Sequence, residues 1–221
     1  MEERYIRNLG ALTEEECAAL RTKKIFVAGC GGLGGHIIDM LLRLGVGAVT
    51  AADGDVFEPS NLNRQLLSDM TVIGESKAAA AKAHAERVNP GVEFTSVEAF
   101  VDESNASSLI SGCDVVIDAL DNIPSRKLLA RLCGEAGIPY VHGAICGWVA
   151  QAALLLPGDA LLDALYPDGA ALADKSSLAF TPTLCAALQT ALCVKLLCGR
   201  PVEPGRLYYF DLLDMDFETL F

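Results

Sequence analysis

Paired cysteines are absent from this chain of 221 residues, because none of its eight cysteines stands in a C-x-x-C spacing. Such pairs are the usual carriers of structural zinc and of redox-active disulfides. Most of the cysteines lie instead within apolar stretches, as Cys185 and Cys193 do. We therefore interpret them as reduced, buried thiols of a cytoplasmic protein.

An excess of positive charge is also missing. The chain has 17 Lys and Arg residues against 29 Asp and Glu residues, which gives a formal net charge of −12. Proteins that bind nucleic acid usually present a basic surface, so this balance argues against nucleic acid as a partner. A locally basic pocket for a nucleotide stays compatible with it.

The chain shows no internal repeat, no low-complexity linker and no apolar leader in its first ten residues. Hydrophobic residues make up 52% of it, enough for one dense core. The most apolar window, 178–198, is interrupted by Pro182, Gln189 and Lys195. We therefore expect a buried helix there and no membrane span.

The stretch 24–65 carries the most informative pattern. In order, it contains an apolar strand (25–28), the glycine-rich turn GCGGLGG (29–35), a helix (33–44), a second strand (49–52) and Asp53. This is the order of a phosphate-binding βαβ unit. Glycines let backbone N–H groups approach phosphates, and a helix N-terminus adds partial positive charge.

Strand-like and helical stretches alternate along the rest of the chain. Further strands are expected at 92–97, 113–120, 138–142, 151–156 and 206–212, and helices at 13–20, 76–88, 124–133 and 181–197. The first of these helices begins with a capping box, Thr13 with Glu16. Segment 158–177 has no clear period, and we expect the acidic tail after 212 to follow the last strand. The alternation predicts an α/β fold with a doubly wound, mostly parallel sheet and helices on both faces.

The glycine turn alone also fits a dinucleotide site, so an NAD oxidoreductase is an alternative. The loop NLNRQ (61–65) discriminates between the two. Amides and a guanidinium placed after the second strand suit chemistry on a triphosphate, because charge develops on the phosphoryl oxygens. We expect this loop to lie over the carboxyl ends of the strands, where such sheets bind ligands.

Asp53 and Asp121 each follow a predicted strand and should lie at that same edge. Asp121 could hold Mg²⁺, while Arg64 and Lys77 could neutralise a triphosphate. Simpler roles stay open: Asp121 could cap the helix that follows it, and Arg64 could form a surface ion pair. Arg7 lies either in a solvated tail or in an arm that delivers an arginine to a phosphate.

Seven motifs together resemble the ThiF/MoeB/HesA family, relatives of the ubiquitin-activating E1 enzymes. They are RYIRN (4–8), GCGGLGG (29–35), DGD (53–55), NLNRQ (61–65), G-x-x-K (74–77), NP (89–90) and DALDN (118–122). The resemblance runs nearly end to end and implies a Rossmann-like, usually homodimeric enzyme. It also implies one E1-like ATP-binding adenylation domain over 1–221, with an N-terminal arm (1–22) and a crossover loop (158–182).

The resemblance implies an adenylyltransferase that uses ATP to activate the C-terminal glycine of a small ubiquitin-like sulfur-carrier protein and releases pyrophosphate. It implies that the phosphates are cradled by Gly29, Gly31, Gly32 and Gly34 and that Asp53 holds the ribose. It implies triphosphate contacts by Asn61, Arg64, Gln65 and Lys77. It also implies that Asp121 binds Mg²⁺ and that Arg7 reaches the γ-phosphate across the dimer. Asp55 and Asn122, inside the matching motifs, are further candidate nucleotide contacts. His36, His84 and His142 have no evident catalytic partner, so we interpret them as structural or surface residues.

Two of the chain's departures from the family pattern concern cysteine. The two C-x-x-C pairs that bind zinc in most members are missing, so we predict no zinc site. The crossover loop lacks cysteine and Cys185 falls inside the following helix, so a covalent step on cysteine has no support. The compact form is similar to ThiF-like proteins of thiamine thiazole synthesis, whose carrier ends in Gly-Gly. Two alternatives within the family are a nucleotide-binding partner without turnover and an ATP-dependent tRNA-modifying dehydratase.

Overall fold

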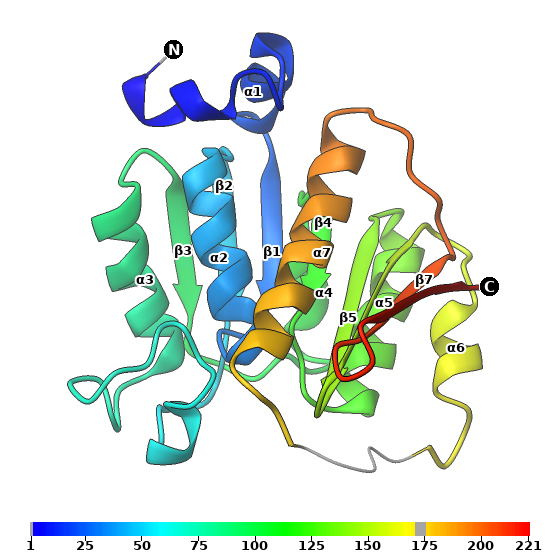
Figure 1. The fold of residues 1–221 in the computed structure, drawn as a ribbon. Coiled ribbons are helices and arrows are strands. Elements are labelled where there is room, and N and C mark those ends of the chain that lie inside the picture. The colour runs from blue at the N-terminus through cyan, green and yellow to red at the C-terminus, as the bar shows by residue number, and fades with distance from the viewer. Residues whose placement is uncertain (1, 171–175) are drawn as a thin grey trace.

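The structure, a computed structural model, describes residues 2–170 and 176–221. One eight-stranded sheet lies at its centre, in the order β3-β2-β1-β4-β5-β6-β7-β8 (Figure 1). The strands are β1 (Lys24–Ala28), β2 (Ala48–Ala52), β3 (Glu93–Val97), β4 (Val115–Asp118), β5 (Tyr140–Cys146), β6 (Val149–Leu155), β7 (Leu207–Asp211) and β8 (Asp216–Leu220). The pairings from β3 through β5 are parallel, and those from β5 through β8 are antiparallel.

Helices cover both faces of this sheet. One face carries α2 (Gly32–Leu44), α3 (Lys77–Val88) and α7 (Phe180–Leu197); the other carries α4 (Ala106–Ile110), α5 (Ile123–Ala136) and α6 (Leu161–Leu165). The remaining helices are η1 (Glu3–Asn8), α1 (Glu14–Leu20) and η2 (Pro59–Asn61). The doubly wound α/β fold predicted from the sequence is therefore confirmed.

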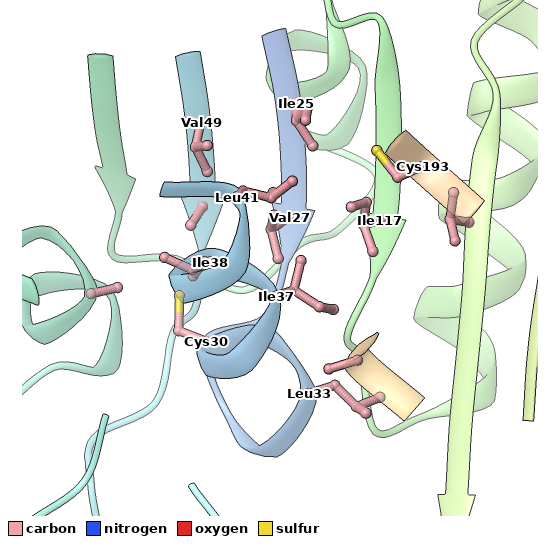
Figure 2. Packing of buried hydrophobic residues seen from close by; sticks show 14 of the residues in the cluster. Ile25, Val27, Cys30, Leu33, Ile37, Ile38, Leu41, Val49, Ile117 and Cys193 are labelled. Carbon is pink, nitrogen blue, oxygen red and sulfur yellow. The ribbon is translucent and has the colours of Figure 1, made fainter. Parts of the chain in front are cut away.

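Helix α2 anchors the glycine-rich turn to the core. Its buried residues recur at helical spacing on the side that faces the sheet: Leu33, Ile37, Ile38 and Leu41. Figure 2 shows these side chains against Ile25 and Val27 of β1 and Val49 of β2. Burial of each such side chain stabilises the fold by about 1.5–3 kcal/mol, so the N-terminus of α2 is held firmly at the end of β1.

The N-terminal segment is fixed at the opposite end of α2. The ring of Tyr5 is buried against Gly45, the residue that ends α2, and its hydroxyl accepts a hydrogen bond of 2.7 Å from Asn89. Helix α1 begins with the expected capping box of Thr13 and Glu16. Figure 1 shows this segment at the end of the sheet away from the carboxyl ends of the parallel strands.

Helix α7 is the expected long core helix, beginning at Phe180. Among residues 2–170 and 176–221 it is the one helix long and apolar enough to cross a membrane, judged by length and composition alone. Its Cys185, Ala186 and Cys193 are fully buried in the core that α2 and the sheet share. The structure thus gives this apolar window the role of a core helix.

One sequence expectation about the second half of the chain was wrong. The strand β7 is not the last one, because β8 pairs with it and Phe217 packs on Phe210 with ring centroids 4.4 Å apart. All five residues of β8 are exposed, so this edge strand has no buried face that would distinguish its sequence from that of an exposed tail. Segment 158–177, which has no periodic pattern, contains α6, a helix too short to show a period. Within the predicted crossover loop (158–182), residues 171–175 lie outside the described residues.

Candidate nucleotide site

A cavity of about 420 Å³ opens at the carboxyl ends of the parallel strands. Its lining includes the glycine turn, the loop after β2, the 61–65 loop, the start of α3 and the turn after β4. All the site residues predicted from the sequence line it except Gly34 and Arg7. Distant parts of the chain therefore meet at the edge where the fold binds ligands.

The glycines of the turn have different roles. Gly29 has a φ of +106°, a conformation that residues with side chains rarely adopt. A Cβ on Gly34 would lie 1.9 Å from the backbone oxygen of Gly29, so packing requires glycine at this position, which is not part of the cavity lining. A Cβ on Gly31 or Gly32 would meet no atom closer than 3.6 Å. Those two glycines therefore leave the N-terminus of α2 open toward the cavity.

Asp53 connects the glycine turn to the loop after β2. One carboxylate oxygen accepts the N–H of Cys30 at 2.7 Å, and the other accepts the N–H of Asp55 at 2.8 Å. Burial raises the pKa of the Asp53 carboxyl, and the two N–H donors and the charge of Lys77 oppose this increase. The carboxylate is thus fixed in the cavity wall, where it can accept hydrogen bonds from ribose hydroxyls.

Lys77 is the first residue of α3 and is 7% exposed. Its ammonium contacts the carboxylate of Asp55 at 3.1 Å, and its backbone N–H donates to the Asp55 backbone oxygen. Because Asp55 is itself half exposed, an anionic ligand can compete with it for the ammonium. Lys77 therefore provides a positive charge at the cavity wall.

The 61–65 loop contributes a cation and a buried amide. Arg64 donates to the backbone oxygen of Ser60 at 3.0 Å and to Asn63 at 2.8 Å, and its side chain lies near Gly32. Gln65 is 7% exposed, yet its Oε1 has no hydrogen-bond partner. A buried polar atom without a partner costs free energy unless a ligand or water satisfies it. The side-chain oxygen of Asn61 instead has a structural partner, since this Oδ1 accepts the N–H of Glu58.

The turn after β4 resolves one open alternative. Asn122, and not Asp121, caps α5, because the Asn122 side chain accepts the N–H of Ser125 at 2.9 Å. Asp121 is exposed at the cavity and takes part in a further interaction within the chain. The capping role considered for Asp121 is therefore filled by Asn122.

Arg7 is not brought to this cavity in its own chain. It is exposed in η1, beside the C-terminal end of α2, whereas the cavity lies at the N-terminal end of that helix. The 13 residues of α2 separate the two ends by about 20 Å at 1.5 Å per residue. Arg7 can therefore reach a nucleotide site only if that site belongs to another copy.

The sequence analysis missed Phe100, which lies three residues after β3. Its ring lines the cavity, is 64% exposed and lies over Gly54, where a Cβ would be 2.6 Å from the ring. The backbone oxygen of Phe100 accepts a hydrogen bond of 2.7 Å from Asn105. An exposed aromatic ring on a fixed backbone can stack on a purine base. Its place at a strand end was the available signal.

ATP fits the residues present. Open backbone N–H groups at a helix N-terminus and two cations suit a triphosphate, and Asp53 suits a ribose. Phe100 offers a surface for the base, and the partnerless buried atom of Gln65 indicates a ligand or solvent contact at the turn. A single carboxylate such as Asp121, together with phosphate oxygens and water, is the kind of site that Mg²⁺ takes. Among the described residues no three His, Cys, Asp or Glu side chains form a metal-binding group.

These features define a nucleotide-binding α/β domain. The sequence model of the ThiF family matches residues 4–220, so the chain belongs to the ThiF family. It is similar to the SAMP-activating enzyme E1 of Haloferax volcanii, with 37% identity over 99% of this chain and 84% of that protein. It is also similar to the sulfur carrier protein ThiS adenylyltransferase of Bacillus subtilis, with 34% identity over 87% of this chain and 59% of that protein. With this family membership, the prediction that the chain is an adenylyltransferase of the E1-like type is confirmed.

A solved structure of Escherichia coli MccB with ATP has the same fold. Its TM-score is 0.84 at 20% sequence identity, over 100% of this chain and 71% of that chain. At this identity the likeness concerns the fold alone. It agrees with a Rossmann-like architecture.

Proposed function

We propose that this chain uses ATP to adenylate the C-terminal glycine carboxylate of a small ubiquitin-like sulfur-carrier protein, with release of pyrophosphate. The observation that carries the proposal is the single cavity shared by the open glycine turn, Asp53, Lys77 and Arg64. The names of the archaeal and bacterial relatives, which refer to SAMP and ThiS, support a small protein as the substrate. The unit proposed to act is the single domain 1–221.

The chemistry of this step needs no acid or base. A carboxylate is already a nucleophile, so the protein has to align it with the α-phosphorus and neutralise charge on the phosphates. Lys77 and Arg64 supply the positive charge, and the N–H groups at the start of α2 add hydrogen bonds. Asp53 and Phe100 fix the nucleoside, so that the α-phosphate is held at the turn.

We further propose that Asp121 binds Mg²⁺, with Asn122 beside it as a further nucleotide contact. Mg²⁺ supplies positive charge to phosphate oxygens when it is bound. The exposed position of Asp121 at the end of β4 supports this role, as does the capping of α5 by Asn122. We predict no structural zinc in this chain.

The position of Arg7 supports a homodimer in which each N-terminal arm serves the other copy. Arg7 is exposed and about 20 Å from the cavity of its own chain, by the length of α2. The arm itself is fixed by Tyr5, so a large movement toward its own cavity would break buried contacts. An arginine on a fixed arm suits delivery to a γ-phosphate in a neighbouring subunit.

The carrier is proposed to be of the ThiS or MoaD type and to end in Gly-Gly, with thiamine thiazole synthesis as the pathway. The similarity to a ThiS adenylyltransferase supports this choice, while the SAMP-activating relative favours a different carrier. We propose the cytoplasm as the site of action, in keeping with eight cysteines that are all free. Five of these cysteines are buried, and Cys146 is exposed.

A second candidate is a nucleotide-binding partner without turnover. Cys185, the cysteine next to the predicted crossover loop, is 0% exposed, and burial raises the pKa of its thiol to about 12. It is therefore a poor acceptor for an activated carrier. The basic residues at the cavity argue for turnover in the adenylation step itself.

The test is ATP–pyrophosphate exchange with Mg²⁺ and a candidate carrier ending in Gly-Gly. We expect Lys77→Ala, Arg64→Ala and Asp121→Ala each to lower the exchange rate roughly 100-fold or more. Lys82→Ala is the matched control, because Lys82 is exposed on the same helix as Lys77. Wild-type exchange rates in the Arg64 and Asp121 variants would contradict the site.

Three other outcomes would favour the alternatives. ATP binding without carrier-dependent exchange would favour the partner without turnover. Exchange that depends on tRNA and not on a carrier would favour the dehydratase. Binding of NAD in place of ATP would favour the oxidoreductase.

A further inference from the structure

A cluster of buried and half-buried polar side chains lies at the nucleotide cavity, which Arg126 lines, and the proposed chemistry makes no use of it. It consists of Asp118 at the end of β4, Arg126 on α5, His142 on β5, Gln151 on β6 and Tyr166 after α6. Asp118 and His142 are 0% exposed, Arg126 is 4% exposed and Tyr166 is 8% exposed. Buried polar groups are costly unless they are paired, so their arrangement is informative.

The cluster holds the backbone of one residue from both sides. The Leu120 N–H donates to Oδ1 of Asp118 at 2.9 Å. The Leu120 backbone oxygen accepts hydrogen bonds from both Nε, at 3.2 Å, and Nη2 of Arg126. Leu120 directly precedes Asp121, and its oxygen belongs to the peptide group that joins the two residues. The orientation of this peptide group therefore depends on Arg126, while Asp118 holds the preceding Ala119–Leu120 peptide group through the Leu120 N–H.

Tyr166 occupies the remaining end of the guanidinium. Its hydroxyl accepts a hydrogen bond of 3.0 Å from Nη1 of Arg126 and lies 3.3 Å from Nε2 of His142. His142 contacts Oδ2 of Asp118 through Nδ1 at 2.8 Å. The four side chains thus close a ring of contacts, since Arg126 Nε also lies 3.6 Å from Asp118.

Charge in this ring is balanced. Burial alone would raise the pKa of Asp118, but the positive charge of Arg126 and the contact with His142 hold it below its usual value. Burial lowers the pKa of His142 more than Asp118 raises it, so the imidazole is neutral at pH 7. A neutral His142 then donates a hydrogen bond from Nδ1 to Asp118 and accepts one from the Tyr166 hydroxyl at Nε2.

We propose that Arg126 and Tyr166 are positioning residues for the adenylation step: they fix the Leu120–Asp121 peptide group and so aim the Asp121 carboxylate into the cavity. This inference rests on the proposed function, because it assigns a reaction to Asp121. Tyr166 acts through Arg126 and touches no substrate. Since Tyr166 follows α6, the segment after β6 contributes to the site through this contact.

The test combines kinetics with a measurement that does not depend on catalysis. We expect Tyr166→Phe, which removes one hydroxyl, to lower the kcat of carrier-dependent ATP–pyrophosphate exchange about 10-fold, with KM for ATP within about 2-fold of wild type. Arg126→Lys, which cannot hold Leu120 and Tyr166 together, should lower kcat roughly 100-fold. Hydrogen exchange at the Leu120 amide should become faster in both variants.

Leu129→Val is the matched control, because Leu129 is fully buried on the same helix and in the same core as Tyr166, but its apolar side chain forms no hydrogen bond. It should lower the thermal midpoint of unfolding without changing kcat or exchange at Leu120. Equal loss of kcat in Leu129→Val and Tyr166→Phe at equal thermal stability would overturn the proposal. Unchanged kcat and unchanged Leu120 exchange in folded Tyr166→Phe would overturn it as well.

Failure of the proposed function can be told apart from failure of this inference. If wild-type protein exchanges no pyrophosphate with any carrier, the proposed function fails, and the Leu120 amide alone decides the inference. Faster exchange of the Leu120 amide in Tyr166→Phe but not in Leu129→Val then supports the positioning role of Arg126 and Tyr166. Equal exchange in wild type and in both variants overturns it.

Discussion

At the scale of single residues, two glycines of the nucleotide turn are constrained by different neighbours. Gly34 lies against the backbone of Gly29, so the helix and the turn can approach each other only without a side chain at this position. A Cβ on Gly32 would meet its nearest neighbour, a side-chain atom of Pro182, only at 3.7 Å, and Gly32 lines the cavity. Close packing therefore requires glycine at position 34, and access for a ligand favours glycine at position 32.

We expect Gly34→Ala to lower the free energy of unfolding by about 1–3 kcal/mol, because the new methyl group overpacks the turn. The Gly34→Ala variant should also lose ATP binding. Gly32→Ala should keep the wild-type unfolding free energy, since alanine favours the first turn of α2. Urea unfolding measures the unfolding free energies, and titration calorimetry measures ATP binding. Wild-type stability of Gly34→Ala would contradict the argument.

The exposed ring of Phe100 leads to a second prediction at this scale. If the ring stacks on adenine, Phe100→Ala should weaken ATP binding about 10-fold, since an aromatic pair contributes about 0.5–1.5 kcal/mol beyond its buried area. Phe100→Trp should keep the affinity. Met70→Ala is the control, because Met70 is 78% exposed and lies outside the cavity lining. Equal Kd values for Phe100→Ala and wild type would exclude stacking.

At the scale of elements, helices α2 and α3 are tied together by one carboxylate. Asp39 on α2 accepts hydrogen bonds from Arg43 at 2.8 Å and contacts His84 of α3 at 2.9 Å. Burial works against its ionisation, but His84 and Arg43 together hold the pKa of Asp39 at about 2, below its usual 3.8. The side chain is 15% exposed, so solvent screens these contacts only in part.

A folded-state pKa below the unfolded one means that this carboxylate contributes stability at higher pH. The contribution is complete above about pH 4 and disappears as the pH falls toward about 2. We expect Asp39→Asn to unfold more easily than wild type at pH 7, with the difference shrinking across that window. Urea midpoints against pH test this, with Asp168→Asn as an exposed control. A difference that stays constant down to pH 2 would contradict the assignment.

The elements that local patterns specify could be predicted from the sequence. The run 25–28, the spacing of apolar residues on α2 and the capping box of Thr13 depend on nearby residues alone. Strand β8 could not be predicted, because an exposed edge strand has no buried face to produce alternation. The structural role of His142 could be predicted, but its contact with Asp118 depends on which strands become neighbours.

The candidate site shows the same difference between features set by nearby residues and features set by long-range packing. Motifs on one loop, such as Gly29 with Gly31 or Arg64 with Gln65, were visible in the sequence and line one cavity. Phe100 was not visible, because its exposure depends on how the loop after β3 meets Gly54. Long-range packing decides such positions, and a single sequence does not display it.

At the scale of the whole molecule, the two ends of the sheet carry complementary parts of one proposed site. The cavity lies at the carboxyl ends of the parallel strands, and the N-terminal arm with Arg7 lies at the other end (Figure 1). Contacts of Tyr5 with Asn89 and of Arg4 with Asn89 fix this arm. A site that needs Arg7 is therefore complete only when a second copy supplies it.

This geometry predicts complementation between two inactive variants. Arg7→Ala and Arg64→Ala should each be inactive in carrier-dependent pyrophosphate exchange. In a mixed dimer, the Arg7→Ala subunit keeps its own Arg64 and receives Arg7 from the Arg64→Ala subunit. One of the two sites of the mixed dimer is therefore complete. Equal amounts of the variants, unfolded together and refolded, should recover about a quarter of wild-type activity, because half of the randomly paired dimers are mixed.

The control mixes Arg7→Ala with Lys82→Ala, whose exposed lysine lies outside the cavity lining. There, each intact Arg7 belongs to a Lys82→Ala subunit, and half of all sites receive it from a neighbour, so about half of wild-type activity is expected. If Arg7 served its own cavity, mixing Arg7→Ala with Arg64→Ala would recover nothing, because neither chain would hold both arginines. Since α2 keeps the arm and the cavity about 20 Å apart, recovery of activity is the expected result.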